Sequence, residues 1–430
     1  MDAFLYILAV FGFILLLARV KVPLTLSILS GTFLMGILFD LSIPDNLEVM
    51  LLGVIQPRTI ALFVITVLLL SLSGMMQRTG QFEKVVGFAR AMFRRPALAM
   101  MALPALVGLL PMPGGALFSA PMVKTAANNE DVKGGMLSAV NYWYRHIWEH
   151  WWPLYPGVIL AVSLSGLAYS KFLVLQLPLG IFMAICGLWV FKGSHPDIHK
   201  RTGKPAEGVK RQLIKATSPI WMILLIWAGI RLLVGLIFPE QGDSETNRIL
   251  LRYAPLGIGL IAAVLWSGII GKAEKSEFIR VWWRKSVLRM GVLVTSVMVF
   301  QYMLTQLEAA EQIAEGLEML RIHPVVITAF LPFIAGAVTG LAIGFVGTSF
   351  PIILSIVAAL PGESILPYIA LGYGFGHLGQ MMSPLHLCYI VSNKYFETGF
   401  SNVYRRMVPA VVTDGALVLG YFFLVRHIVL

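Results

Sequence analysis

The sequence is poor in charged residues and in cysteine. Only 13% of its 430 residues are Asp, Glu, Lys or Arg, whereas roughly a quarter are charged in soluble globular domains. Its two cysteines, Cys186 and Cys388, both lie in apolar stretches, so we expect neither a disulfide framework nor a cysteine-ligated metal site. Hydrophobic residues make up 58% of the chain and the mean hydropathy is +0.81. This composition excludes an ordinary soluble enzyme and predicts an all-α, polytopic membrane protein.

Long apolar segments predict the membrane-spanning helices. A spanning helix needs about 20 apolar residues. Uninterrupted spans are predicted at 3–19, 23–39, 58–77, 172–192, 217–238, 250–270, 285–304 and 405–427. Residues 1–18 lack the basic segment and the small-residue cleavage site of a signal peptide, so we interpret them as part of the first span.

Four other apolar regions are interrupted by glycine and proline. Residues 96–128 and 322–359 each contain two apolar halves of about 15 residues, too short to cross a bilayer, so each region is predicted to be a re-entrant helical hairpin. Residues 133–168 and 364–394 are long enough to cross but are predicted to be broken in the middle. The predicted breaks lie at Pro153 and Pro156 in the first region and at Gly376, Gly379 and Pro384 in the second.

These interruptions occur twice, which indicates an internal duplication. Pro96 and Pro104 recur 228 residues later as Pro324 and Pro332. In the broken helices, an offset of 231 relates His146, Glu149, Pro153 and Leu154 to His377, Gln380, Pro384 and Leu385. Each repeat would contain five crossings, and an odd number predicts that the two repeats are inverted relative to each other.

The duplication defines the predicted domains. The first repeat, 1–192, would contain scaffold spans (3–77), an interfacial arm (79–94), a hairpin (96–128), a broken helix (133–168) and a last span (172–192). A basic cytoplasmic linker, 193–216, would follow. The second repeat, 217–430, would contain scaffold spans (217–304), an arm (305–320), a hairpin (322–359), a broken helix (364–394) and a last span (405–427).

The distribution of basic residues predicts the orientation. The net charge of +11 would suggest nucleic-acid binding in a soluble protein. With ten crossings, however, 25 of the 33 Lys and Arg residues fall on one side of the membrane. By the positive-inside rule that side is cytoplasmic, and both termini are extracytoplasmic. We therefore expect a protein of the cytoplasmic membrane, with the lipid bilayer rather than nucleic acid as its partner.

The two hairpins and the two broken helices together predict one central binding site. Non-helical backbone survives at membrane depth only inside protein or around a watery cavity. A helix beginning near Ala116 would present free N–H groups, with Ser119 in its first turn, and Gly347, Thr348 and Ser349 would do the same in the second hairpin. Helix N-termini favour an anionic group, and carbonyls of the breaks can hold a coupling cation. A pair of glycine hinges that only pack helices is the alternative.

The first broken helix is rich in ionisable and polar side chains. Such groups are costly inside a membrane and mark binding sites or proton pathways by default. Arg145 is a natural partner for a carboxylate or phosphate, whereas His146, Glu149 and Asp414 could couple transport to protons. A structural ion pair between Arg145 and Glu149, and a cap or interhelical pair at Asp414, are the alternatives. The predicted substrate-binding residues are Pro113, Gly114, Gly115, Ser119, Asn141, Arg145, Gly347, Thr348, Ser349, His377, Gln380, Ser383 and His386.

One motif indicates a different class of protein. His146, Glu149 and His150 match the H-x-x-E-H pattern of inverted zincins, in which two histidines bind zinc and the glutamate is the general base. An intramembrane zinc hydrolase is therefore an alternative. It is not preferred, because the pattern precedes Trp151, Trp152 and Pro153, whereas zinc ligation at this spacing needs a continuous helix.

The layout resembles the ion-transporter superfamily, which includes the divalent anion/sodium symporters, the gluconate permeases and the sodium/proton antiporters. It is most similar to a family of prokaryotic integral membrane proteins related to the gluconate permeases. The resemblance is carried by PMPGGALFSAP (111–121), GLAIGFVGTSFP (340–351), RHIWEHWWP (145–153) and GHLGQMMSP (376–384). It implies an elevator-type transporter, usually dimeric, with a scaffold and a sliding transport domain. The Ser-Asn-Thr signature of the divalent anion symporters is only approximated by Thr348 and Ser349, which weakens the expectation of sodium coupling.

The sequence therefore predicts a secondary transporter rather than an enzyme. We expect it to carry a small organic anion by proton or sodium coupling, as a homodimer, without a cofactor or a bound metal. A cation/proton antiporter using Glu149 and Asp414 is the nearest alternative. A transporter of an amphiphilic anion, such as a lipid phosphate, is another, because Phe118, Phe345 and Phe350 would make the hairpin tips apolar.

Overall fold

The computed structural model describes residues 2–81, 84–85, 95–109, 115–127, 132–192, 209–237, 245–308, 323–358, 360 and 362–429. Every regular element within these ranges is a helix. The helices before the predicted linker are α1 (Asp2–Arg19), α2 (Leu24–Leu38), α3 (Ile43–Ile55), α4 (Pro57–Arg78), α6 (Pro96–Gly108), α7 (Ala116–Ala126), α8 (Gly134–Arg145), α9 (Pro156–Ser165), α10 (Tyr169–Cys186) and the 3-10 helix η1 (Gly187–Phe191).

The second half of the chain is also helical. Its helices are α11 (Val209–Ala216), α12 (Ser218–Ile237), α13 (Glu245–Ile270), α14 (Lys275–Trp282), α15 (Lys285–Gln306), α17 (Pro324–Thr339), α18 (Ala342–Ala358), α19 (Ile365–Met381), α20 (Leu387–Tyr395) and α21 (Phe400–Val429). Helices occupy all eight segments predicted as full spans, whereas α3, α11 and α14 were not predicted. Most of the two predicted arms, and residues 193–208 of the linker, lie outside the described residues.

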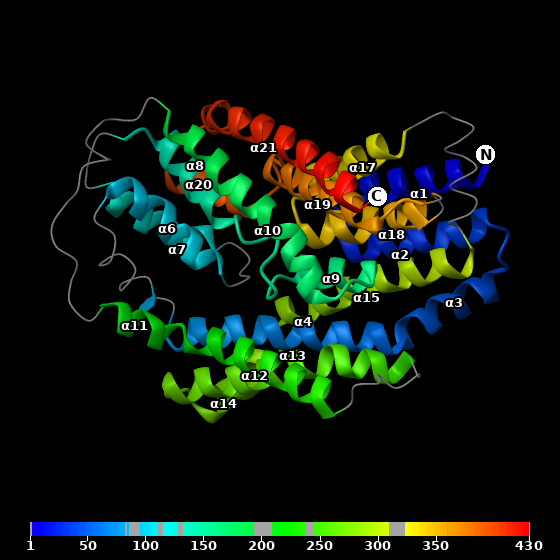
Figure 1. The fold of residues 1–430 in the computed structure, drawn as a ribbon, viewed down its shortest axis with the longest axis horizontal. Coiled ribbons are helices and arrows are strands. Elements are labelled where there is room, and N and C mark those ends of the chain that lie inside the picture. The colour runs from blue at the N-terminus through cyan, green and yellow to red at the C-terminus, as the bar shows by residue number, and fades with distance from the viewer. Residues whose placement is uncertain are drawn as a thin grey trace.

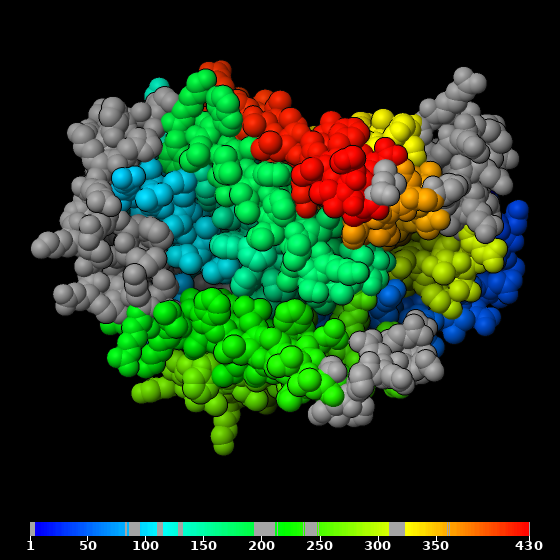
Figure 2. Space-filling view, viewed as in Figure 1, coloured from blue at the N-terminus to red at the C-terminus, as the bar shows by residue number. Residues whose placement is uncertain are grey.

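The composition and outer surface of these helices are those of a multi-pass membrane protein. Five of the described helical segments are long and apolar enough to cross a bilayer: Pro57–Arg78, Tyr169–Phe191, Ile249–Ile270, Lys275–Gln306 and Phe400–Val429. Large aliphatic side chains point outward from them, such as Val174 on α10, which is 73% exposed. Figure 2 shows α10 beside α21 on the outside of the molecule, so such side chains would meet lipid rather than water.

The helices form a layer and a cluster that meet at the centre (Figure 1). The layer contains α4, which packs on α13 and α15, with α12 against α13 and α14 against α4. The cluster contains the two predicted hairpins, α6 with α7 and α17 with α18, and the helices of both broken regions. Helix α9 also contacts α4 and α18, so it links the layer to the second hairpin.

Proline sets the starts of several helices. Pro57, Pro96, Pro156 and Pro324 each occupy the first turn of their helix. The first N–H groups of a helix have no intrahelical acceptor, so proline loses nothing there and its fixed φ angle is already helical. Pro156 therefore restarts the first broken helix as α9, and ten residues, 146–155, separate it from the end of α8 at Arg145.

The second break differs from its prediction. Gly376 and Gly379 lie inside the continuous helix α19, and the chain leaves the helix only at 382–386, around Pro384. The two glycines permit close helix packing instead. A Cβ atom added to Gly379 would lie 2.0 Å from the backbone oxygen of Phe333 on α17, and one added to Gly376 would lie 2.3 Å from the Phe345 ring.

Gly379→Ala is expected to destabilise the protein strongly. The added methyl group would meet backbone atoms of α17, which cannot rotate away, so α17 and α19 would have to separate. Overpacking of this kind costs about 1–3 kcal/mol or more, measurable as a lower thermal unfolding temperature in detergent. Gly12→Ala is the matched control, because nothing lies within 4 Å of its added Cβ. Equal unfolding temperatures for the two variants would contradict the close contact between α17 and α19 described above.

Candidate functional site

The first broken helix is buried over its whole first half. All residues of α8 from Gly135 to Arg145 are buried, and the helix ends at Arg145, after which residues 146–155 form turns. Arg145, His146, Glu149 and His150 are all at most 9% exposed. Ionisable side chains at this depth are costly unless they have a structural or functional role.

Buried hydrogen bonds join α8 to helices of both repeats. The side-chain amide of Asn141 donates to the Ala116 carbonyl at the start of α7 (3.1 Å) and to the Ser392 hydroxyl on α20 (2.8 Å). One turn earlier, the Ser138 hydroxyl donates to the Asn393 side-chain oxygen at 2.6 Å. These bonds hold the start of α7 against α8 and α20. Asn141 was predicted to bind substrate, but its amide nitrogen is occupied by structural contacts.

The two broken regions exchange equivalent hydrogen bonds. The Tyr142 hydroxyl donates to the Gln380 carbonyl (3.3 Å), and the Tyr373 hydroxyl donates to the Glu149 carbonyl (2.7 Å). Both the donors and the acceptors are related by the offset of 231 residues found in the sequence. Reciprocal contacts of this kind arise when two equivalent elements meet about a two-fold axis.

Glycines at equivalent positions of the two hairpins also make equivalent contacts. A Cβ added to Gly108 would lie 2.2 Å from the Arg145 carbonyl oxygen, and one added to Gly336 would lie 2.2 Å from the Gly376 oxygen. Arg145 and Gly376 are again 231 residues apart. Each hairpin therefore places a glycine directly against the backbone of its own broken helix, which draws hairpin and break together at the centre of the molecule.

Glu149 lies where the two broken regions meet. Its Oε2 accepts a hydrogen bond from the Gln380 side-chain amide at 2.6 Å, and Gln380 is its own counterpart in the second repeat. The Nε2 atom of His146 lies 3.8 Å from Oε1, and the Nε2 atom of His377 lies 3.9 Å from Oε2. The carboxylate is thus flanked by two imidazoles and held by an amide. The ring centroids of His377 and His150 are in turn 4.2 Å apart.

Arg145 reaches the start of the first hairpin's second helix. A Cβ added to Gly115, the residue before α7, would lie 2.3 Å from the Arg145 Nη2 atom. Glycine at this position therefore makes room for the guanidinium at the helix N-terminus. Pro113 and Gly114, which were also predicted to bind substrate, lie outside the described residues.

A cavity of about 170 Å³ lies beside these groups. Most of its lining is apolar, and its polar side chains are those of Arg145, His146, Glu149, Tyr155, Gln380, His386 and Cys388. Leu70 of α4 and Met290 of α15 form part of the opposite wall. The cavity therefore lies between the broken helices and the helices predicted to form the scaffold.

Three helix N-termini meet at this cavity. The first two residues of α9 (Pro156 and Gly157), of α18 (Ala342 and Ile343) and of α20 (Leu387 and Cys388) all line it. The first N–H groups of each helix have no intrahelical acceptor, and each N-terminus carries about half a positive charge. With Arg145 on the same wall, the cavity is electrostatically suited to an anion.

The predicted N-terminal role of Gly347, Thr348 and Ser349 is wrong. Helix α18 begins at Ala342, so these residues lie in its second turn, where backbone N–H groups are bonded within the helix. The Thr348 and Ser349 hydroxyls donate to the Gly344 and Phe345 carbonyls at 2.8 and 2.6 Å. The prediction failed because the motif has one glycine in the turn, Gly340, and two more, Gly344 and Gly347, inside helix α18.

Some of the remaining predicted residues lie at the cavity or contact Glu149, and the others are buried elsewhere or bonded to nearby backbone. His386 and Gln380 line the cavity, and His377 contacts Glu149. Ser119 is buried in the first turn of α7, where its hydroxyl donates to Ala116 at 3.4 Å, and the Ser383 hydroxyl accepts from the Leu385 N–H in the second break. Asp414 is buried on α21 outside the cavity lining, and its carboxylate oxygens have no hydrogen-bond partner among the described residues.

The geometry does not match the inverted zincin motif. Residues 146–150 form turns after α8 has ended, so His146 and His150 are not on one face of a continuous helix. The same break means that Arg145 and Glu149 do not lie one turn apart on a continuous helix. His150 stacks against His377 instead of pointing with His146 toward a shared position.

The aromatic residues of the second hairpin do not make an apolar tip. Phe345 and Phe350 are at most 1% exposed, and both pack edge-on against Tyr373. They fill the protein core beneath the Tyr373–Glu149 hydrogen bond. The apolar part of the cavity lining therefore comes from aliphatic residues such as Leu70, Met290 and Leu387, and not from the phenyl rings that the sequence suggested.

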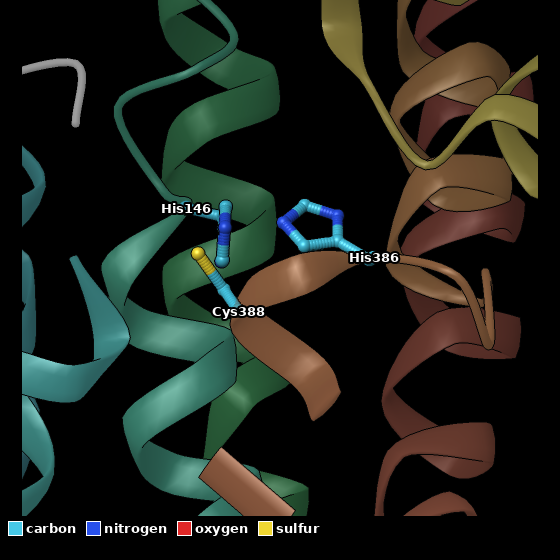
Figure 3. A group of neighbouring side chains, drawn as sticks. All are labelled: His146, His386 and Cys388. Carbon is cyan, nitrogen blue, oxygen red and sulfur yellow. The ribbon is translucent and has the colours of Figure 1, made fainter. Parts of the chain in front are cut away.

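Sequence reasoning missed Cys388 and the two tyrosines. Cys388 was set aside because it lies in an apolar stretch, yet it is the second residue of α20 and faces the cavity beside His146 and His386 (Figure 3). Tyr142 and Tyr373 could have been found from the offset of 231, because it relates them as it relates the residues recognised on either side.

The fold is similar to that of solved membrane proteins. The chain is similar to the YdaH transporter of Alcanivorax borkumensis, whose crystal structure was reported to reveal an unusual topology, with a TM-score of 0.53 and 14% identity over 88% of each chain. It also matches MtrF of Neisseria gonorrhoeae, reported to illuminate a class of antimetabolite efflux pumps, with a TM-score of 0.45 and 11% identity over 87% of this chain and 82% of that one. No curated protein sequence matches the chain.

One family model covers nearly the whole sequence. It matches residues 3–233 and 246–425, which include both hairpins, both breaks and every residue of the cavity lining. The family is described only as a protein of unknown function, so it assigns the site no role. The chain belongs to this family, DUF401.

Proposed function

We propose that the protein is a secondary active transporter of a small organic anion, coupled to protons. The observation that carries this proposal is the meeting of three helix N-termini and Arg145 at one cavity. Aligned N–H groups and a guanidinium recognise a carboxylate or phosphate by charge and hydrogen bonding together. The volume of about 170 Å³ favours a small anion over one with a long acyl chain.

The fold is consistent with transport. The Alcanivorax borkumensis protein with a similar fold is named a transporter. The reciprocal tyrosine bonds across an offset of 231 residues support two inverted repeats. In transporters built from inverted repeats, the site lies at the repeat interface and is formed by broken helices, and the cavity described above has both features.

The position of the cavity supports an elevator mechanism as part of this proposal. Leu70 and Met290 belong to the predicted scaffold, whereas the other walls belong to the broken helices and the second hairpin. Sliding of the latter elements past α4 and α15 would carry an anion across the bilayer without dismantling its hydrogen bonds. The Arg252 guanidinium on α13 donates to the Val162 and Gly166 carbonyls at the end of α9 (2.8 and 3.3 Å), and such a movement would break these bonds.

Proton coupling is assigned to Glu149. Its carboxylate is the acidic group of the described cavity lining and lies within 3.9 Å of two imidazole nitrogens. Protonation of Glu149 would remove a negative charge from the cavity when the anion enters. Loss of that proton would restore the charge when the anion leaves. Sodium is the alternative coupling ion, held by carbonyls of the two breaks, and the gradient that drives uptake distinguishes the two.

A cation/proton antiporter on the same scaffold is the second candidate. The observation that favours it is Asp414, a buried carboxylate whose oxygens lack a hydrogen-bond partner among the described residues. With Glu149 it would make a pair of acidic sites in the interior. We prefer the anion transporter, because Asp414 lies outside the cavity at which the three helix N-termini and Arg145 meet.

The assembly and orientation are part of the proposal. Exposed leucines on α12, such as Leu225 and Leu232, would face lipid or a second copy in a homodimer. In the proposed orientation the protein lies in the cytoplasmic membrane. By the positive-inside rule its linker would then be cytoplasmic and both termini extracytoplasmic.

Anion binding can be tested before transport. A ligand present at about 100 times its Kd stabilises the folded state by about 2.7 kcal/mol. We expect one or more small carboxylates or phosphates to raise the unfolding temperature of the purified protein, and matched neutral amides or esters to leave it unchanged. If Na⁺ raises it and none of the anions does, the anion site is contradicted and the antiporter is favoured.

A further inference from the structure

Two histidines and a cysteine meet at the second break. The side chains of His146, His386 and Cys388 point toward one another (Figure 3), and one ligand atom of each lies within 4.8 Å of the others. All three residues are buried and all three line the 170 Å³ cavity. They come from the end of α8, the second break and the first turn of α20, so the fold, rather than a local motif, brings them together.

The surroundings fix the orientation of His146. Its Nδ1 atom lies 2.6 Å from the Tyr142 carbonyl oxygen, which makes Nδ1 the protonated donor. Nε2 is then the nitrogen with a free lone pair. Metal-bound histidines commonly donate their second ring nitrogen to a backbone carbonyl in this way, which fixes the tautomer and the ring orientation. The Nδ1 atom of His386 has no hydrogen-bond partner among the described residues.

The donor set defines the class of ion. Two imidazoles and a thiolate suit a borderline or soft transition-metal ion such as Zn²⁺, and are poor ligands for Na⁺, Mg²⁺ or Ca²⁺. Bond lengths of about 2.0–2.3 Å place tetrahedral ligand atoms about 3.5 Å apart. The side chains would therefore close in by about 1 Å, which rotation of His386 in its non-helical segment can supply.

We propose that His146, His386 and Cys388 bind one Zn²⁺-class ion whose fourth coordination position faces the cavity. Three protein ligands and one open position are the arrangement of zinc sites that bind an exogenous ligand. Glu149 Oε1 lies 3.8 Å from His146 Nε2, near enough to accept a hydrogen bond from a metal-bound water. The Cys388 thiolate and the Glu149 carboxylate would balance the charge of the ion beside Arg145.

This site differs from the zincin motif of the sequence. Of that motif only His146 is a protein ligand here, and His150 stacks on His377 instead. The assignment does not depend on the proposed transport of an organic anion, because metal binding is measured at equilibrium with no organic substrate present. Failure of one proposal therefore leaves the other untouched.

Cobalt titration of the purified full-length protein tests the assignment. After treatment with a chelator, we expect Co²⁺ to bind at about one ion per chain, with a thiolate-to-cobalt charge-transfer band and the intense visible bands of a tetrahedral site, and Zn²⁺ to displace it. Cys388→Ser should abolish the charge-transfer band, and His386→Gln should weaken binding at least about 100-fold. Cys186→Ser is the matched control and should bind as the wild type does.

A second measurement keeps the test independent of variant folding. X-ray absorption of the zinc-loaded wild-type protein should show one sulfur neighbour at about 2.3 Å and nitrogen or oxygen neighbours at about 2.0 Å. A first shell without sulfur would overturn the assignment. So would Co²⁺ affinity that is unchanged in His386→Gln, or binding that is absent from the wild type.

Discussion

Arg145→Gln is expected to reduce anion uptake sharply at substrate concentrations near the wild-type half-saturation point. The guanidinium adds a full positive charge to a cavity whose other recognition groups are partial charges at helix N-termini. A hydrogen bond to a charged group contributes about 1.5–3 kcal/mol. Because each 1.4 kcal/mol is tenfold in affinity, the concentration for half-maximal uptake should rise about 10- to 100-fold.

The measurement is uptake of a labelled anion into proteoliposomes, with two controls. Arg231→Gln removes the same charge from an exposed position on α12, outside the cavity lining, and should transport as the wild type does. Arg145→Lys keeps the charge but loses the bidentate geometry, so partial activity is expected. Wild-type affinity in Arg145→Gln would show that the guanidinium has only a structural role against Gly115.

Glu149→Gln is expected to abolish the coupling of anion uptake to the proton gradient without abolishing anion exchange. Glutamine has nearly the same shape and can still bond to Gln380, but it cannot bind and release a proton. Uptake driven by a proton gradient should therefore fall to the equilibrium level, whereas exchange of labelled for unlabelled anion across the membrane should continue. Both quantities are measurable in the same proteoliposome preparation.

Asp414→Asn is the matched control for Glu149. It removes a second buried carboxylate that does not line the cavity, so gradient-driven uptake should persist. The reverse pattern, with coupling lost in Asp414→Asn and kept in Glu149→Gln, would assign the proton to α21 and contradict the role of the Glu149 cluster.

Much of the architecture could be predicted from the sequence because membrane helices leave strong signals. Apolar length located the spans, and the recurrence of Pro96 and Pro104 as Pro324 and Pro332 located the hairpins, which the structure shows as packed helix pairs. The offset of 231 even related Glu149 to Gln380, which contact each other. Helix α3 was missed because its 13 residues are too few for a span.

The site was harder to predict because glycine has more than one structural use. The sequence predicts a helix break at Gly376 and Gly379, whereas both glycines lie inside the continuous helix α19 and let it approach its neighbours closely. The sequence likewise predicts a helix start at Gly347, although α18 begins five residues earlier, at Ala342. Local sequence does not distinguish a flexible glycine from one required by a neighbouring backbone.

The grouping of His146, His386 and Cys388 depends on tertiary structure. Cys388 and His146 are 242 residues apart, and they meet only because α20 packs against α8. Cys388 is buried, in keeping with its apolar sequence neighbourhood. It gave no indication that the thiol would face two imidazoles across a cavity.

Gradient-driven uptake by the wild-type protein tests the central claim most directly. Proteoliposomes would be given an inward proton gradient and a panel of labelled small carboxylates and phosphates, with a protonophore as the control. The account predicts that at least one anion accumulates above equilibrium and that the protonophore abolishes the accumulation. If no anion enters, and Na⁺ or K⁺ instead exchanges for protons in the wild type but not in Glu149→Gln, the protein is an antiporter and the anion site is contradicted.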